Sequence, residues 1–215
     1  MNLMLLAAAV AAQVAQGGLE TTIERANPTI ALARVAHKGA PALRLLDRPE
    51  EGLDPIVLLP IGEFRNGVIE AEVAGLPSPH ASPAMRGFIG IAFRVQKDPS
   101  RYEAFYIRPT NGRAGDQLRR NHAIQYIGMP DYPWDRLRKE TPGAYESYAD
   151  MVTGEWTRLR IEVEEEQARL YVGGADQPSL IVNDLKLGPD ASGGVGLWSG
   201  AGTEGYFRNV KVTNS

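Results

Sequence analysis

Hydrophobic and polar residues alternate with a period of two along most of the chain after Gly18, and clusters of Gly, Pro, Asn and Asp interrupt the alternation. Such alternation indicates strands with one buried face. Helical periodicity is restricted to the N-terminal segment and to a turn near residues 134–139. The predicted strands are residues 29–36, 42–46, 56–59, 68–74, 88–96, 102–108, 123–127, 156–164, 168–172, 179–182, 195–199 and 206–213. Many short strands separated by turns are typical of two packed antiparallel sheets.

The stretch RGFIGIAFRVQKDPSRYEAFYIRP, at residues 86–109, predicts a hairpin that turns at KDPS. Its register decides which side chains share a face of the sheet. A turn with an odd number of residues places Ile91 and Phe93 on the same face as Phe105 and Ile107. Burying these side chains is worth roughly 1.5–3 kcal/mol each, against about 1 kcal/mol for the exposed ion pair that the even register offers. We therefore expect the odd register.

The odd register gives the other face of the hairpin small residues beside tyrosines and arginines, namely Gly90, Ala92, Arg94, Tyr102, Tyr106 and Arg108. Small residues beside large polar ones form a depression. Aromatic rings stack on the apolar faces of sugars, and arginine donors bind hydroxyl and carboxylate oxygens. This face is a candidate sugar platform, and the alternative is a solvent-exposed sheet face without a ligand.

Residues 111–155 contain one short predicted strand in an otherwise irregular segment. Loops of this length are uncommon in compact domains unless they are functional or disordered. The segment is too aromatic for a solvated tail, so we expect it to cover one sheet. Residues 108–140 hold seven basic and four acidic side chains, which favours an anionic or hydroxyl-rich ligand over the alternative of a solvated loop with internal salt bridges. The predicted ligand-binding residues are Arg94, Tyr106, Arg108, Asn111, Arg120, Gln125, Trp134 and Arg138.

Three glutamates are candidates for catalysis, because glycoside hydrolysis usually needs two carboxyl groups about 5–10 Å apart. Glu70 and Glu72 share one face of a predicted strand at a spacing of about 6–7 Å, although any half-exposed strand has this pattern. The odd register turns Glu103 toward the core, where a carboxylate must find a donor or take a raised pKa, as a general acid does. A position at the rim, held by Arg101, is the alternative for Glu103.

Length and composition fit one sandwich domain, which we place at residues 19–215 of the 215-residue chain. A net charge of −3, from 23 basic and 26 acidic residues, gives no overall field that would hold nucleic acid or an anionic membrane. The absence of cysteine excludes disulfides and thiolate metal sites, and the three histidines have no ligand-like spacing. We expect no metal and no cofactor. Calcium and the oligomeric state stay open.

The first sixteen residues, MNLMLLAAAVAAQVAQ, predict a secretory signal peptide. Their apolar run is too short to span a bilayer, and small residues suited to signal-peptidase cleavage follow it. The alternative is a mature N-terminal helix, because no Lys or Arg precedes the run. A signal implies export to the periplasm or the exterior of a bacterial cell, and no membrane contact after its removal.

The pieces FRNGVIEAEV, RGFIGIAFR, GEWTRLRIEV followed by ARLYV, and GGVGLWSGAGTEGYFRNVKV occur in this order along the chain. Together they resemble the concanavalin A-like lectin/glucanase sandwich, particularly secreted bacterial 3-keto-disaccharide hydrolase-like domains and, more distantly, laminin-G-like domains. The resemblance covers roughly residues 22–213 and implies a jelly roll whose concave sheet binds carbohydrate. The glucanase branch carries E-x-D-x-x-E on one strand. This chain has only EAE at residues 70–72, with Gly75 at the third position, so no catalytic residue is carried over.

The sequence therefore predicts an all-β, two-sheet antiparallel jelly-roll β-sandwich with a long covering loop insertion. Its expected function is that of a secreted carbohydrate-active protein. We expect it to cleave a glycosidic bond of a sugar bound on the concave sheet, under residues 111–155. The alternative is a non-catalytic, lectin-like carbohydrate-binding module, which the missing carboxylate pair favours.

Overall fold

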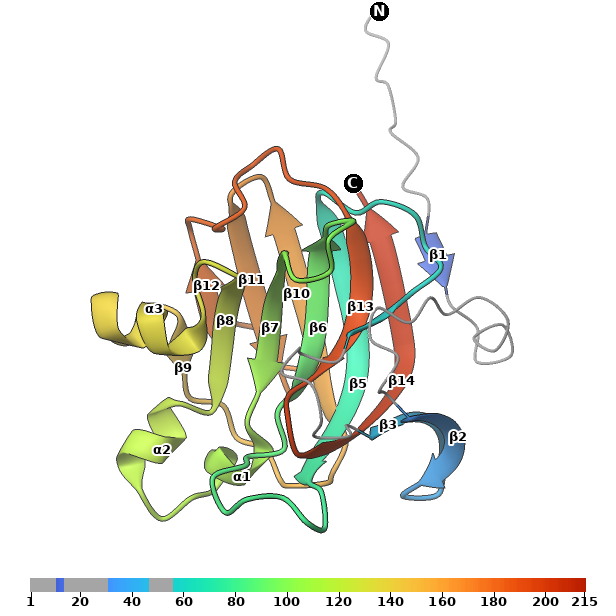
Figure 1. Cartoon of the computed structure of the whole chain (residues 1–215), viewed down its shortest axis with the longest axis vertical. Coiled ribbons are helices and arrows are strands. Elements are labelled where there is room, and N and C mark those ends of the chain that lie inside the picture. The colour runs from blue at the N-terminus through green and yellow to red at the C-terminus, as the bar shows by residue number, and fades with distance from the viewer. Residues whose placement is uncertain (1–10, 14–30, 47–55) are drawn as a thin grey trace, which may run out of the picture.

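The computed structural model describes residues 11–13, 31–46 and 56–215 and shows two stacked antiparallel β-sheets (Figure 1). The larger sheet has the order β12-β11-β10-β5-β14-β3-β2, and β1 pairs with β14 beside it. Its strands are β1 (Ala11–Gln13), β2 (Ala31–His37), β3 (Ala40–Leu46), β5 (Gly67–Pro77), β10 (Thr157–Glu164), β11 (Gln167–Val172), β12 (Leu180–Val182) and β14 (Thr203–Asn214).

The second sheet has six strands in the order β4-β13-β6-β7-β8-β9. They are β4 (Ile56–Leu58), β6 (Ile89–Val95), β7 (Tyr102–Ile107), β8 (Ile124–Met129), β9 (Glu146–Ser147) and β13 (Gly194–Ser199). Every strand pair in both sheets is antiparallel. The predicted all-β sandwich is confirmed, and each predicted strand is present with its ends shifted by a few residues, except that residues 29–30 of the first one lie outside the described residues.

Residues 1–10 and 14–16 of the predicted signal segment lie outside the described residues, and Ala11–Gln13 form β1. The signal peptide and the domain boundary at residue 19 stay predictions. Among the described residues, no helix is long and apolar enough to cross a membrane.

The main core lies between the sheets and comes from the alternation seen in the sequence. Ile69 and Val73 of β5 project inward from the larger sheet and pack in one cluster with Ile91 and Phe105 of the six-stranded sheet. Fully burying a side chain of this size contributes roughly 1.5–3 kcal/mol to stability. A second apolar cluster lies on the outer face of the six-stranded sheet, so all residues of β6 and β7 are buried.

The predicted odd register of the β6–β7 hairpin is confirmed. Ile91 pairs with Phe105, and Ile89 pairs with Ile107. Gly90 is the partner of Tyr106, so both lie on the outer face, as the sequence predicts. The burial of Ile89, Ile91, Phe105 and Ile107 in the core therefore determines the register.

The predicted position of Arg94 on the outer face is wrong, because a β-bulge interrupts the alternation. Where β6 meets β13, Gly196 pairs with Ala92 and Gly194 pairs with Val95, so β6 has one extra residue. Arg94 takes a positive φ of 51° at this bulge. Its side chain therefore turns inward, and Val95 joins the outer apolar cluster.

The segment between β7 and β10 contributes β8 and the short edge strand β9 to the sheet and folds into short helices between the strands. It contains three helices, α1 (Pro109–Gly112), α2 (Gln117–Asn121) and α3 (Trp134–Glu140), of which α3 coincides with the predicted helical turn. Asp116 caps α2 by accepting a hydrogen bond from the Arg119 backbone N–H at 2.7 Å. Figure 1 shows α2 and α3 on the β8 side of the sheet and α1 below the end of β7.

Candidate functional site

A cleft of about 620 Å³ opens on the outer face of the six-stranded sheet. Small-molecule pockets typically enclose roughly 300–1,000 Å³. The insertion supplies one wall, and the segments around residues 84–88 and 200–201 supply the other. The side chains that dominate the lining are aromatic or cationic: Phe88, Tyr106, Trp134, Trp198, Arg86, Arg108, Arg119 and Arg138.

The floor of the cleft is a stack of two aromatic rings over Gly90. Gly90 pairs with Tyr106 on one side and with Trp198 on the other. The two rings stack with centroids 4.6 Å apart. A Cβ at Gly90 would approach the backbone oxygen of Phe105 to 2.0 Å, so only glycine fits there. Tyr106 and Trp198 retain only 2% and 4% of their surface exposed, so the stack is a packed floor, and the open aromatic surface of the cleft comes from Trp134, which is 46% exposed.

Arg108 is buried at the edge of this floor and is held in place by three oxygen acceptors. Its guanidinium donates to the His122 carbonyl at 2.9 Å, to the Tyr106 hydroxyl at 2.8 Å and to Gln125 Oε1 at 3.2 Å. It also lies 4.9 Å above the Tyr106 ring. Burial lowers the pKa of Arg108, but a guanidinium stays protonated in proteins. Arg108 is therefore a rigidly positioned positive charge.

Arg86 and Arg119 add two further cations at the mouth of the cleft. Arg86 donates to backbone carbonyls, and Arg119 donates to the side-chain oxygen of Asn111 at 3.3 Å. Burial lowers the pKa of Arg86, and the charge of Arg119 lowers it further, so the two guanidiniums repel each other. Within residues 31–46 and 56–215, neither forms a salt bridge with a carboxylate.

Arg138, Glu146 and His122 form a cluster on the insertion side of the cleft. Arg138 binds the Glu146 carboxylate through two nitrogens, with Nη2 at 2.7 Å from Oε2 and Nε at 3.0 Å from Oε1. His122 Nδ1 lies 2.7 Å from the same Oε2. The angle at Nδ1 is not that of a well-directed hydrogen bond, so this is a close polar contact between the imidazole and the carboxylate. Arg138 also stacks 4.8 Å above the Trp134 ring.

The pKa of His122 is lowered from its ordinary value of 6.5, chiefly by burial. The Glu146 carboxylate opposes this shift, and the guanidiniums of Arg138 and Arg108 reinforce it. The imidazole is therefore neutral at neutral pH. A neutral imidazole beside a carboxylate can act as a general base.

Glu103 faces the core, as the odd register predicts, and not the cleft. Its Oε1 accepts hydrogen bonds from the Tyr126 hydroxyl at 2.6 Å and from the Leu187 N–H at 3.2 Å, and its Oε2 lies 3.2 Å from Arg94 Nη1. Burial raises the pKa of Glu103, while these donors oppose the shift. The alternative rim position beside Arg101 is wrong, since Arg101 lies 3.6 Å from Asp131 instead.

The inward turn of Arg94 makes it the partner of Glu103 rather than a ligand-binding side chain. Besides Glu103, its guanidinium donates to the backbone oxygens of Arg65 at 3.1 Å, Gly188 at 3.0 Å and Glu165 at 2.6 Å. The side chain has no exposed surface. Arg94 therefore ties together the loops at one end of the sandwich.

Glu70 and Glu72 lie on the outer face of the other sheet, away from the cleft. Glu72 pairs with Arg208 and accepts from Asn209 at 2.9 Å, while Glu70 lies 3.9 Å from Lys211. Such pairs are what a half-exposed strand displays. Neither glutamate lines the cleft, and none of the described residues that line it is Asp or Glu.

The remaining predicted binding residues divide into two groups. Asn111 and Trp134 line the cleft together with Tyr106, Arg108 and Arg138. Gln125 is buried behind Arg108, where it positions the guanidinium. Arg120 donates to the Tyr148 hydroxyl at 2.7 Å and is not part of the cleft lining. Among the described residues, no three His, Cys, Asp or Glu side chains gather as metal ligands.

Sequence reasoning missed several residues of this site, namely His122, Glu146, Trp198, Arg86, Arg119 and Phe88. One available signal was the alternation in GVGLWS, which places Trp198 on the face opposite Leu197. His122 and Glu146 carry no such signal, because the strand β8, the helix α3 and their connecting loops separate them along the chain.

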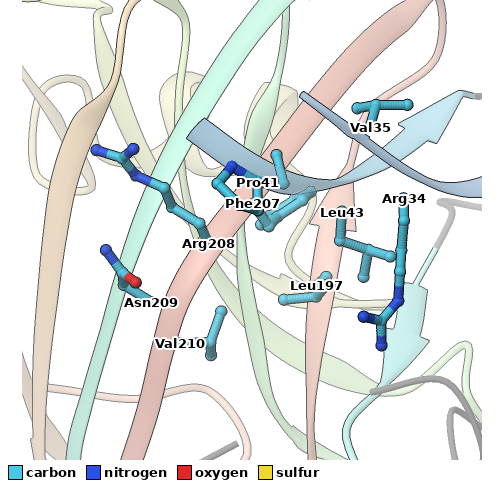
Figure 2. A pocket seen from close by; sticks show the side chains of 10 residues that line it. Arg34, Val35, Pro41, Leu43, Leu197, Phe207, Arg208, Asn209 and Val210 are labelled. Carbon is cyan, nitrogen blue, oxygen red and sulfur yellow. The ribbon is translucent and has the colours of Figure 1, made fainter. Parts of the chain in front are cut away.

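Two other cavities lack this combination of rings and charges. The first lies between the β2–β3 hairpin and β14, where Figure 2 shows Leu43, Phe207 and Val210 between Arg34 and Arg208. It holds about 70 Å³, far below the roughly 300 Å³ at which ligand pockets begin. The second, of about 980 Å³, is lined by loops around residues 58–63, 95–99 and 192–194 and contains no aromatic ring.

No family model matches the chain, and no curated protein matches it in sequence. The fold resembles that of carbohydrate binding module CBM66 from Bacillus subtilis, with a TM-score of 0.59, 13% identity and coverage of 88% of this chain and 94% of that one. A Bacillus subtilis protein with a galectin-like fold has a TM-score of 0.59, 12% identity and coverage of 92% and 91%. The cellulose-induced protein Cip1 has a TM-score of 0.52, 11% identity and coverage of 88% of both chains. The fold is therefore the concanavalin A-like jelly roll.

Proposed function

We propose that this concanavalin A-like sandwich binds carbohydrate in the cleft on the outer face of its six-stranded sheet. The observation that carries the proposal is the combination of aromatic and arginine side chains in the cleft lining, where Trp134 is exposed above the packed floor of Tyr106 and Trp198. A sugar offers an apolar ring face to the exposed aromatic surface and hydroxyl groups to the guanidiniums. The carbohydrate-binding module that shares the fold supports the same class of ligand.

Hydrolysis by a pair of carboxylates has no support at this cleft. Glu103 is buried on the opposite face of the sheet, and Glu70 and Glu72 lie on the other sheet. A two-carboxylate mechanism requires both groups to reach the same glycosidic bond. Binding is therefore the function that the geometry supports best.

Replacing Trp134 tests the proposal, because this side chain lines the cleft and is 46% exposed. Trp134→Ala is expected to weaken saccharide affinity about tenfold, or about 1.4 kcal/mol, with little change in melting temperature. Calorimetry with a panel of neutral and acidic oligosaccharides measures the affinity. Ile181→Ala is the matched control, since Ile181 is 47% exposed on β12 of the other sheet. Unchanged affinity in Trp134→Ala would show that the cleft is not the binding site.

Export is part of the same proposal and rests on the predicted signal segment at residues 1–16. Expression of the full chain in a bacterium, followed by N-terminal sequencing of the periplasmic or secreted protein, tests it. We expect a mature N-terminus after residue 12, 15 or 16, and an uncleaved cytoplasmic product contradicts export.

A further inference from the structure

Building on the carbohydrate-binding cleft proposed above, we propose that its ligand is a uronate-containing saccharide, which the protein cleaves by β-elimination with His122 as the base. The inference rests on two independent features of the cleft. One is its excess of positive charge, and the other is the contact between His122 and Glu146.

The positive charge of the cleft is only partly neutralised by the described part of the chain. Four guanidiniums line the cleft, and no carboxylate among the described residues does. Of the four arginines, only Arg138 forms a salt bridge with Glu146, whereas Arg86, Arg108 and Arg119 bond to carbonyl, hydroxyl and amide oxygens. A neutral sugar leaves these charges uncompensated. A sugar carboxylate compensates them and forms charge-assisted hydrogen bonds with a guanidinium.

The contact with Glu146 determines which ring nitrogen of His122 faces the ligand. Nδ1 is buried against the Glu146 carboxylate, which favours the tautomer with its proton on Nδ1. The side chain keeps 19% of its surface exposed and lines the cleft, which leaves Nε2 as the nitrogen available to a ligand. Nε2 then carries the lone pair that accepts a proton.

The elimination is balanced without any further reactant. His122 Nε2 takes the proton from C5 of the uronate, and the electrons of that C–H bond form a double bond between C4 and C5. The C4–O bond to the preceding sugar breaks, and its electron pair leaves with the oxygen, which takes a proton from water. The hydroxide that remains takes the proton back from His122, so the neutral imidazole is restored. An arginine paired with the carboxylate makes the C5 proton more acidic by stabilising the charge that develops there.

This chemistry accounts for the composition of the cleft. Hydrolysis of a glycoside calls for two carboxyl groups, but elimination calls for a base and for cations around the sugar carboxylate. Within residues 31–46 and 56–215, the lining supplies His122 and the arginines and includes no Asp or Glu. Glu146 acts through His122 and is a positioning residue.

The experiment uses the full chain with polygalacturonate, alginate and glucuronan, and with a neutral glucan of similar length. Calorimetry measures binding, and ultraviolet absorbance detects the double bond conjugated with the carboxylate. We expect at least tenfold tighter binding of one or more polyuronates than of the glucan. We expect an absorbance increase with a polyuronate and none with the glucan.

One substitution separates the catalytic step from binding, and a second tests whether Glu146 acts through His122. His122→Asn is expected to slow product formation about 100-fold or more while affinity changes less than about threefold. His80→Asn, in an exposed loop outside the cleft lining, is the matched control and is expected to behave as wild type. Glu146→Gln is expected to shift the acidic limb of the rate profile to lower pH, because the Glu146 charge raises the pKa of His122. A merely structural role for Glu146 does not move that limb.

The outcomes distinguish this inference from the proposed function. Binding of a polyuronate without an absorbance increase overturns the elimination and leaves carbohydrate binding intact. Equal affinity for glucan and polyuronates overturns the uronate class. Absence of binding to every saccharide overturns the proposed function and the inference with it.

Discussion

Two arginine–glutamate pairs occupy opposite faces of the six-stranded sheet, and they differ in what surrounds them. Arg94 and Glu103 lie inside the sandwich with no exposed side-chain surface. Arg138 and Glu146 lie at the cleft, where the Arg138 side chain is 32% exposed and Glu146 also contacts His122. The first pair has a protein partner on every side, and the second pair is open to a ligand.

The difference indicates which pair serves the fold and which serves the site. Burying two charges is expensive unless their remaining donors and acceptors are satisfied. The backbone carbonyls around Arg94 and the donors around Glu103 meet that condition. A saturated pair has no donor to offer to a ligand. Arg138 retains exposed surface in the cleft and stacks on Trp134, so it can bind a ligand without leaving Glu146.

Breaking the interior pair is expected to have the largest effect. Glu103→Ala leaves Arg94 buried without its carboxylate and is expected to lower the free energy of unfolding by about 3–5 kcal/mol. Denaturant unfolding followed by tryptophan fluorescence measures the loss. In the double variant Arg94→Met with Glu103→Leu, no uncompensated charge remains, so we expect it to be more stable than Glu103→Ala. A loss below about 1 kcal/mol in Glu103→Ala would show that the interior pair is not structural.

Weakening the cleft pair is expected to change binding more than stability. Arg138→Lys keeps the positive charge beside Glu146 but loses the two-nitrogen contact and the planar stack on Trp134. We expect a loss of stability of about 1 kcal/mol or less and a loss of saccharide affinity of about fivefold to tenfold. Arg136→Ala on the exposed side of the same helix is the control. If Arg138→Lys destabilises the fold as strongly as Glu103→Ala, the distinction between the two pairs fails.

The smallest expected effect is a difference in pH dependence. Because the folded-state pKa of His122 lies below 6.5, the unfolded chain binds a proton in a pH range where the folded chain does not. The free energy of unfolding therefore falls as the pH decreases through 6.5 toward the folded-state pKa. Denaturant unfolding between about pH 7.5 and about pH 5 is expected to show a steeper fall for wild type than for His122→Asn. Identical slopes would mean that the pKa of His122 is the same in the folded and the unfolded chain.

The sequence predicted the sheets well because their strands follow one physical rule. Alternation with a core face placed every predicted strand, and the burial of Ile91 and Phe105 selected the β6–β7 register. The rule failed at Arg94, where one extra residue reverses the alternation. The residues at the bulge, Phe93, Arg94 and Val95, include no glycine or proline, so the sequence alone gives no reason to expect a bulge there.

The site was predicted less completely because its parts come from different elements. Tyr106, Arg108 and Trp134 were found through a strand face and an aromatic segment. The contact between His122 and Glu146 depends on how the insertion folds around α3, and periodicity carries no information about that path. The helices α1 and α2 are also too short to leave a helical pattern in the sequence.

The bulge at Arg94 also separates the hairpin into two parts that tolerate change differently. Up to Ala92, each residue of β6 is fixed by its partners on β7 and β13 beneath the cleft. Beyond Arg94, the chain enters an exposed turn at residues 97–100 that contributes nothing to the cleft lining. Lengthening a surface loop costs little free energy, about 0.6 kcal/mol for each doubling. The turn is therefore a place where a tag, a linker or a second domain can be inserted without altering the register of the strands that hold the ligand.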